Sequence, residues 1–295
     1  MLTYLAVTLS CKNKEDDKIA ESNSSINEVI VCGGDRVVIY DRKVTKDGKF
    51  TNSWEWKALD SNGLPEDFIK YFQTIDECKP IGEDKILITS SGGGVALVER
   101  ETKNTLFYAQ VPNAHSAAYL PNGRIAVALS TAEKGNSLQL FDAEKPNVIL
   151  FSDSLYSGHG AEWAPESESL FALGYDQLRE YKLTNWDTSK PSLEMVNEWK
   201  IPDESGHDLF LTSDQRLLIS TTNSVWQFNI AESKFSEFIP LEGVKNVKSV
   251  NLNVNTGGLV YTKGEINWWT HHVYFENPHD TLIVEDINIY KARIR

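Results

Sequence analysis

The sequence is poor in cysteine, with three among 295 residues: Cys11, Cys32 and Cys78. No two of them have the C-x-x-C spacing of a cysteine-based metal or redox site, so the sequence favours neither class. Cys32 and Cys78 lie in apolar, strand-like runs, where we expect small buried thiols. Whether these two form a disulfide is left open by the sequence.

Positive charge is also scarce. Lys and Arg together number 29 against 42 Asp and Glu, which gives a formal net charge of −13. Non-specific nucleic-acid binding needs clustered basic side chains, so we expect no nucleic-acid partner. The chain has no run of about 18 apolar residues, so no helix is predicted to span a membrane. A self-repelling acidic surface is expected, and with it a monomer.

Helical periodicity and common catalytic signatures are missing as well. No segment of ten or more residues after Asn27 reads as a helix, and residues 64–72 would form at most two turns. Gly92 to Gly94 precede a strand-like run, unlike a phosphate-binding loop that opens a helix. Ser90 and Ser220 lack the G-x-S-x-G context of a serine hydrolase. The sequence therefore assigns no catalytic residue.

What the chain does contain is a repeated β-rich unit. His115, His159 and His207 each open an apolar run that leads through a turn into a second apolar run. They are 44 and 48 residues apart, which is close to the length of one β-propeller blade. One histidine is therefore predicted at the same structural position of three consecutive blades.

Counting such units predicts an all-β fold, a six-bladed β-propeller with four-stranded blades, for which a β-sandwich is the alternative. The final strand, residues 288–293, would complete the first blade and close the ring in a 3+1 arrangement. We expect a signal segment and tether over residues 1–25 and one propeller domain over residues 26–295. The six units cover residues 28–58, 75–110, 115–153, 159–200, 207–240 and 248–285.

Several short motifs resemble an uncharacterised family of six-bladed propeller lipoproteins of Bacteroidetes-type bacteria. They are Cys32 to Asp35, Ser90 to Gly94, the Ala-His and Gly-His strand openings, and Tyr290 to Arg293. The apolar segment before Cys11 is also similar to a bacterial lipoprotein signal peptide. The resemblance implies lipidation at Cys11, and through it an outer-membrane, cell-surface or periplasmic location. Membrane contact is expected only through this anchor.

The innermost strands of a propeller border its central channel, so the first residues of these strands should form a ring. Aligning the units predicts Asp76 or Glu77 in the second blade, with Lys79 as an alternative register. His115, His159, His207 and Lys248 would follow in the next four blades. Lys291 or Arg293 would complete the ring.

Three roles fit the histidines. Neutral imidazoles bind divalent metals, and three of them leave a coordination position open for substrate. They also bind anionic or hydroxyl-rich ligands, or serve as acid or base near neutral pH. The third role is a hydrogen-bonded, water-filled channel. A histidine cluster at the channel is similar to that of the propeller pectate-oligomer lyases, and no cofactor beyond a divalent metal is suggested.

Loops on the same side would add further ligand contacts. Arg36 lies in a short connection of the first blade, and residues 264–271 form a long one in the sixth. Trp268 and Trp269 occupy this polar connection, where their faces could stack on a sugar ring. His271 follows them.

The sequence thus predicts an extracytoplasmic propeller that binds a small polar or anionic ligand, such as a glycan or uronate, in a central pocket. The alternatives are a histidine- or metal-dependent lyase or hydrolase of glycans, and a protein-interaction scaffold. Metal ligands would be the three histidines. The predicted ligand-binding residues are His115, His159, His207, Lys248, Lys291, Trp268, Trp269, His271, Arg36 and Glu77.

Overall fold

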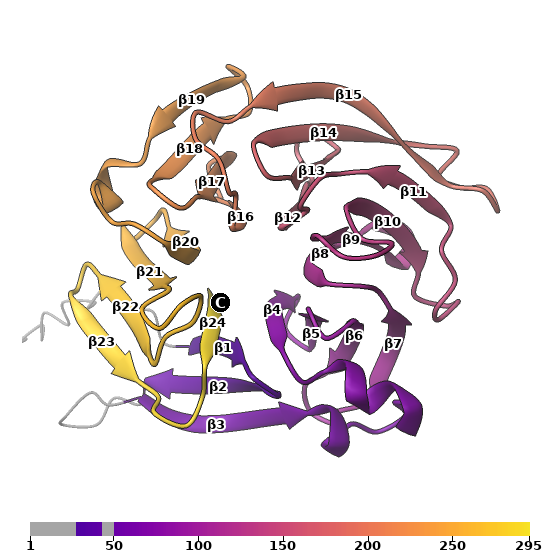
Figure 1. The fold of residues 1–295 in the computed structure, drawn as a ribbon, viewed down its shortest axis with the longest axis horizontal. Coiled ribbons are helices and arrows are strands. Elements are labelled where there is room, and N and C mark those ends of the chain that lie inside the picture. The colour runs from indigo at the N-terminus through magenta and orange to yellow at the C-terminus, as the bar shows by residue number, and fades with distance from the viewer. Residues whose placement is uncertain (1–27, 43–49) are drawn as a thin grey trace, which may run out of the picture.

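Short apolar strands separated by turns assemble into a closed ring of sheets. The computed structural model describes residues 28–42 and 50–295. In these residues, six four-stranded antiparallel sheets surround a central axis (Figure 1). The predicted six-bladed β-propeller is therefore confirmed. Cys11 and the predicted tether within residues 1–25 lie outside the described residues.

Each blade runs from an inner strand at the axis to an outer strand at the periphery. The first blade comprises β24 (Ile289–Ile294), β1 (Glu28–Gly33), β2 (Arg36–Arg42) and β3 (Phe50–Lys57). The second comprises β4 (Ile75–Ile81), β5 (Lys85–Ser90), β6 (Gly94–Glu99) and β7 (Thr105–Gln110). The third comprises β8 (Ala114–Leu120), β9 (Arg124–Leu129), β10 (Ser137–Asp142) and β11 (Phe151–Ser154).

The fourth blade comprises β12 (Gly160–Ala164), β13 (Ser169–Leu173), β14 (Gln177–Thr184) and β15 (Ser192–Lys200). The fifth comprises β16 (Asp208–Leu211), β17 (Arg216–Ser220), β18 (Val225–Asn229) and β19 (Lys234–Glu237). The sixth comprises β20 (Val247–Asn253), β21 (Gly258–Lys263), β22 (His272–Glu276) and β23 (Asp280–Ile283). Over residues 28–42 and 50–295, helical structure is limited to short 3-10 segments at Ala58–Asp60, Glu66–Tyr71, Pro121–Gly123 and Ile239–Leu241. Within the described residues no helix has the length and apolar character to cross a membrane.

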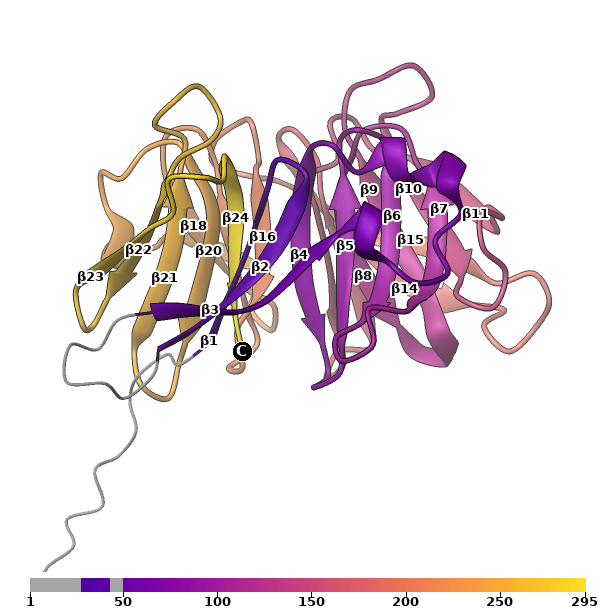
Figure 2. The ribbon, with the colours of Figure 1, turned by 90° about the horizontal axis from the view of Figure 1, so that it is seen from below.

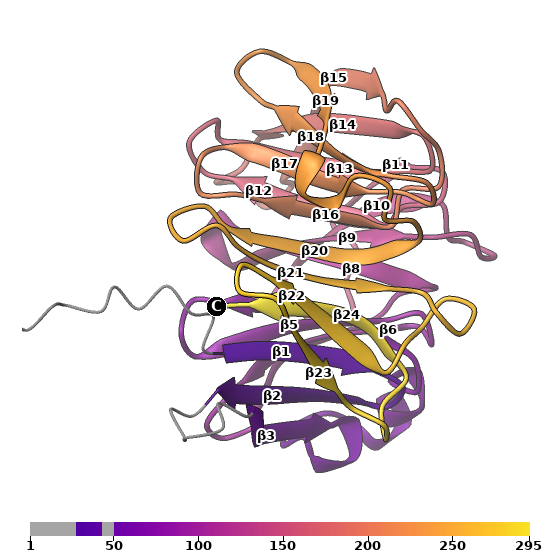
Figure 3. The ribbon, with the colours of Figure 1, turned by 90° about the vertical axis from the view of Figure 1, so that its left-hand side faces the viewer.

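The two ends of the described chain meet in one blade. β24 pairs antiparallel with β1, as predicted for 3+1 closure (Figures 1 and 3). The two backbones approach closely at Gly33, where a Cβ atom would lie 2.0 Å from the carbonyl oxygen of Asn288. Only glycine fits there, because any side chain would displace β24.

Alternating side chains along each strand fill the spaces between blades. In β1, Ile30 and Cys32 pack toward the second blade, whereas Val29 and Val31 pack toward the sixth. Trp56 is fully buried in the first of these spaces, edge-on to Phe72. The core is therefore divided into layers between neighbouring blades, and the inner ends of the strands remain free for polar groups.

The first residues of the inner strands lie together on one side of the ring, here called the upper face. In Figure 2 the chain ends at the lower side after β24, so β24 begins at the upper face. The 3-10 helix at Glu66–Tyr71 marks the same face.

Candidate functional site

The inner strands begin with a ring of polar and aromatic side chains at the upper face. Four ring residues, Asp76, His115, Lys248 and Tyr290, fall where the pairing register of their strands shifts by one residue. Such a bulge leaves the extra residue unpaired and redirects its side chain. The ring residues are Asp76, His115, His159, His207, Lys248 and Tyr290.

A left-handed backbone turn precedes most ring positions. The residue two positions earlier has a positive φ in four blades: Asn113 (51°), Ser157 (49°), Ser205 (60°) and Asn246 (58°). Asn and Ser are short polar residues of the kind favoured in such turns. The same backbone turn therefore recurs around the axis, and at His115 and His159 the carbonyl of the turn residue lies next to the imidazole.

Two histidines are held in one tautomer by that carbonyl. His115 Nδ1 lies 3.2 Å from the Asn113 oxygen, and His159 Nδ1 lies 2.9 Å from the Ser157 oxygen. A carbonyl only accepts hydrogen bonds, so Nδ1 carries the proton in both rings. The Nε2 atom of each neutral imidazole is therefore left as an acceptor.

The three histidines form a contiguous, uncharged arc. The ring centroids of His115 and His159 are 4.3 Å apart, and those of His159 and His207 are 5.8 Å apart. Burial lowers the pKa of His115 to about 4 and that of His159 well below its ordinary value. Burial, with the nearby Lys248 ammonium, lowers the pKa of His207 to about 2. All three are neutral at physiological pH.

Lys248 places a cation beside this arc. Its side chain is buried, and Nζ donates to His207 Nε2 at 2.9 Å. No carboxylate of the described residues lies within 4.0 Å of Nζ. Burial, followed by repulsion from Lys291, lowers the pKa of Lys248 to about 8, so the ammonium is largely charged at neutral pH.

Asp76 is the acidic member of the ring. One carboxylate oxygen accepts the Ser91 backbone N–H, and the other lies 3.9 Å from His115 Nε2. Burial raises the pKa of Asp76 to about 7 despite the hydrogen bonds from Ser91. Asp76 therefore exchanges its proton near neutral pH. Tyr290 completes the ring, with its ring edge-on to that of His115.

The ring lies at the base of a cavity of about 590 Å³, a size typical of small-molecule sites. Trp268 and Trp269 form part of its rim, and Trp268 is 63% exposed. Hydroxyl and amide side chains from several loops complete the wall. They include Gln73, Thr74, Ser91, Asn113, Ser130, Thr131, Ser157 and Asn288.

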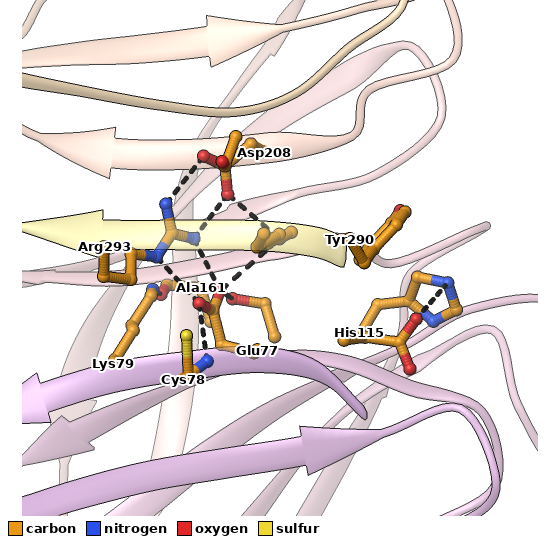
Figure 4. Close-up of polar contacts among 12 residues, drawn as sticks. Glu77, Cys78, Lys79, His115, Ala161, Asp208, Tyr290 and Arg293 are labelled. Atoms are coloured by element: carbon orange, nitrogen blue, oxygen red, sulfur yellow. Dashed lines mark hydrogen bonds and ion pairs between the residues drawn. The ribbon is translucent and has the colours of Figure 1, made fainter. Parts of the chain in front are cut away.

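Beneath the ring, a buried ion cluster fills the channel. The cluster comprises Glu77, Asp208, Lys291 and Arg293, all at most 2% exposed. Figure 4 shows Arg293 between Asp208 and Glu77, with Tyr290 and His115 toward the beginning of β24. Arg293 Nη2 lies 2.7 Å from Glu77 Oε2 and 2.6 Å from Asp208 Oδ1. Lys291 Nζ lies 2.9 Å from Asp208 Oδ1.

The cluster is internally neutral, with two carboxylates and two cations. Burial alone would raise the pKa values of Glu77 and Asp208, but Arg293 and Lys291 lower both below their ordinary values. Below the cluster, Lys79 Nζ pairs with Glu162 Oε1 at 2.7 Å. These side chains occupy the channel, so the cavity is closed on its lower side.

Glu77 and Lys291 therefore lie in a different layer from the one predicted. Both were expected among the ring residues, but the bulges in β4 and β24 put Asp76 and Tyr290 there instead. The sequence predicts Asp76 or Glu77 in the second blade, and Asp76 is the one in the ring, whereas it does not predict Tyr290. The spacing of Asn288 two residues before Tyr290, as in Asn113 before His115, is the sequence signal that indicates this register.

Two further predicted residues lie outside the cavity lining. His271 Nδ1 lies 3.0 Å from the Ile287 carbonyl oxygen, and its ring lies edge-on to that of Trp269, with centroids 5.1 Å apart. Arg36 pairs with Asp35 and Asp286, 3.2 and 3.3 Å away. The structure thus brings together His115, His159, His207, Lys248, Trp268 and Trp269, but not Arg36, Glu77, His271 or Lys291.

The metal-binding role of His115, His159 and His207 stays a prediction. Among the residues that the structure describes, no three His, Cys, Asp or Glu side chains are grouped so as to hold a metal ion. His207 Nε2 already accepts a hydrogen bond from the Lys248 ammonium, and this positive charge would repel a metal cation bound at the same nitrogen. Cys32 and Cys78 are buried, free thiols between the first two blades.

Comparison with known proteins identifies a family but no activity. A family model described as "Family of unknown function (DUF6528)" matches residues 1–295. No curated protein matches the chain.

Proposed function

We propose a function from the site itself, because the chain belongs to the family of unknown function DUF6528, for which no activity is described. The upper-face cavity binds a small, hydroxyl-rich anion of the uronic-acid class, such as an acidic sugar of a glycan. The observation that carries this proposal is the buried ammonium of Lys248, which lines the cavity without a carboxylate partner among the described residues.

A buried charge is costly unless an opposite charge accompanies it. In the ion cluster below, each cation has carboxylates within 3.4 Å. Lys248 instead donates to a neutral imidazole, and its pKa is lowered by burial and then by the nearby Lys291. A ligand carboxylate would supply the missing counter-charge and make a charge-assisted hydrogen bond.

The rest of the wall is suited to a sugar rather than to a simple anion. The Nε2 atoms of His115 and His159 accept hydrogen bonds from hydroxyl groups. Serine, threonine and asparagine side chains of the wall both donate and accept. An indole face at the rim provides the apolar surface on which pyranose rings stack.

The test is calorimetric titration with a uronic acid and with the corresponding neutral sugar. We expect the acid to bind and the neutral sugar to bind at least tenfold more weakly. Loss of one charge-assisted hydrogen bond costs about 1.5–3 kcal/mol, so Lys248→Met should weaken binding of the acid by about 10- to 150-fold. Lys200→Met, at a side chain that is 82% exposed, is the matched control and should leave affinity unchanged. Equal binding of both sugars, or unaltered binding by Lys248→Met, would contradict the proposal.

Asp76 favours a second candidate, acid–base catalysis on the bound glycan. A carboxyl group with a pKa near 7 is suited to giving or taking a proton at neutral pH, and Asp76 faces the same cavity. Incubation with acidic oligosaccharides, with and without divalent cations, followed by mass spectrometry would reveal cleavage. Asp76→Asn should abolish it, and the absence of any product from the unaltered protein would remove this candidate.

We also propose that Cys11 carries a lipid anchor, which would bring the cavity to extracellular glycans. The support is the apolar segment before Cys11 and the charged stretch after it. Metabolic labelling with a fatty acid should mark the unaltered protein but not a Cys11→Ser variant. Equal labelling of both would refute the anchor.

A further inference from the structure

We infer that the cavity recognises the end of an acidic oligosaccharide chain, and not an internal stretch of it. The terminal uronate enters first, with its carboxylate toward Lys248, and the next sugar leaves over Trp268. This inference rests on the function proposed above and adds how the ligand is presented.

The first argument is that the cavity has a closed base. The ion cluster lies directly beneath the ring and is at most 2% exposed. Lys79 and Glu162 form a further pair in the channel, with 8% and 16% of their side chains exposed. A chain cannot thread through the axis past these side chains, so a ligand enters and leaves by the upper face.

The second argument is the distribution of chemistry along the cavity. The cation and the neutral imidazoles lie at the inner ends of the strands, whereas Trp268 lies at the rim and is 63% exposed. A terminal residue with an acid group matches the polar base. An indole open to solvent matches a sugar that is only partly enclosed, which is the second unit of a chain.

The third argument is that the loop carrying the tryptophans is held in place. This loop, residues 264–271 and here called the Trp loop, turns back on itself through hydrogen bonds of Glu265 N and Ile266 N to the Trp269 oxygen, at 3.0 and 2.9 Å. Thr270 N and O bond to Ile289 on β24, at 3.0 and 2.8 Å.

One carboxylate fastens the base of the Trp loop to the sixth blade. Glu265 accepts hydrogen bonds from the Thr270 and Tyr274 hydroxyls, and Oε2 lies 2.7 Å from His272 Nδ1. Although burial opposes it, these hydrogen bonds lower the pKa of Glu265 to about 2, so the carboxylate stays charged across the neutral range. An aromatic surface fixed before binding loses little entropy when a ligand stacks on it.

The experiment measures both chain-length dependence and stoichiometry, with galacturonic acid, its dimer and trimer, and long polygalacturonate. We expect the dimer and trimer to bind about three- to tenfold more tightly than the monomer, the size of one aromatic stacking contact. Trp268→Ala should remove that gain, so that the monomer, dimer and trimer bind the variant with the same affinity. Met195→Ala, an exposed residue on the outer strand β15, is the control and should change neither. The number of protein molecules bound per polygalacturonate chain should not rise with chain length.

The outcomes separate the two proposals. If none of the acids binds, the proposed function falls and this inference falls with it. If the monomer binds but occupancy rises with chain length, or if Trp268→Ala weakens monomer and trimer equally, the proposed function stands and the chain-end inference is overturned.

Discussion

Replacing Arg293 by methionine should destabilise the propeller by more than any surface substitution. The guanidinium contacts both carboxylates of the ion cluster, with Nε 2.7 Å from Glu77 Oε1 and Nη1 2.8 Å from Asp208 Oδ2. Methionine would leave two buried carboxylates with Lys291 alone, so the cluster would carry a net charge of −1. Removing one partner of a buried ion pair typically costs about 3–5 kcal/mol. We expect a loss of this size.

Urea unfolding followed by tryptophan fluorescence measures the effect. For a chain of this size the denaturant slope is at least about 3 kcal/mol/M, so the midpoint should fall by roughly 1 M. The control is Arg295→Met: Arg295 pairs with Glu28 at 3.7 Å from an exposed position and should change stability by less than about 1 kcal/mol. A second substitution, Glu77→Gln, removes the excess charge and should cost less in the Arg293→Met background than alone.

The reasoning is refuted if Arg293→Met and Arg295→Met unfold at the same midpoint. Additive effects of Arg293→Met and Glu77→Gln would likewise contradict a coupled cluster. Because Arg293 and Lys291 lower the pKa values of Glu77 and Asp208, this stabilisation is present above the ordinary carboxylate pKa values and is lost only as pH falls through the lowered ones. The difference between the variants should therefore persist at pH 5.

Three further predictions concern the cavity and the closure. Binding of an acidic sugar should weaken about tenfold as pH rises from 6 to 8.5. Over this range Asp76, with a pKa of about 7, gains a negative charge, and Lys248, with a pKa of about 8, loses its positive charge. Calorimetry at several pH values checks this, and Asp76→Asn should remove the part of the affinity change that occurs near pH 7. Protein stability should fall as pH drops from about 6.5 toward 4, because the pKa of His115 is lowered to about 4 in the folded protein and the unfolded chain takes up the proton first. Urea titrations at several pH values measure this fall, which should be smaller in His115→Gln. Gly33→Ala should lower the melting temperature by several degrees, because its Cβ would meet the Asn288 oxygen at 2.0 Å; an unchanged melting temperature would show that β24 can shift freely.

The architecture could be read from the sequence because each blade repeats one local pattern. Alternating apolar residues, turn residues and the spacing of His115, His159 and His207 all follow from short-range geometry. The sequence predicts the position of the terminal strand correctly because a three-stranded first blade has an unpaired inner edge. The sequence does not show where the outer strand of the third blade begins: β11 starts at Phe151, after a left-handed turn at Asn147 (φ 60°).

The site was less predictable, since it depends on single-residue shifts and distant contacts. A bulge moves every following side chain to the other side of the strand, and the apolar pattern of β4 or β24 does not show where it occurs. The sequence therefore predicts Glu77 and Lys291 in the ring, whereas the structure places both in the ion cluster. The partnership of Arg293 with Glu77 joins positions 216 residues apart, so no local motif indicates it.

The ring residues at the bulges also allow the cavity wall to change while the fold stays the same. At Asp76, His115 and Lys248 the strand pairing skips the residue and resumes at the next one. Substitution there alters the cavity wall but removes no pair from the ladder and no apolar side chain from the layers between blades. Ligand preference can therefore diverge among proteins of this architecture one position at a time, and a designer could retune the cavity by the same substitutions.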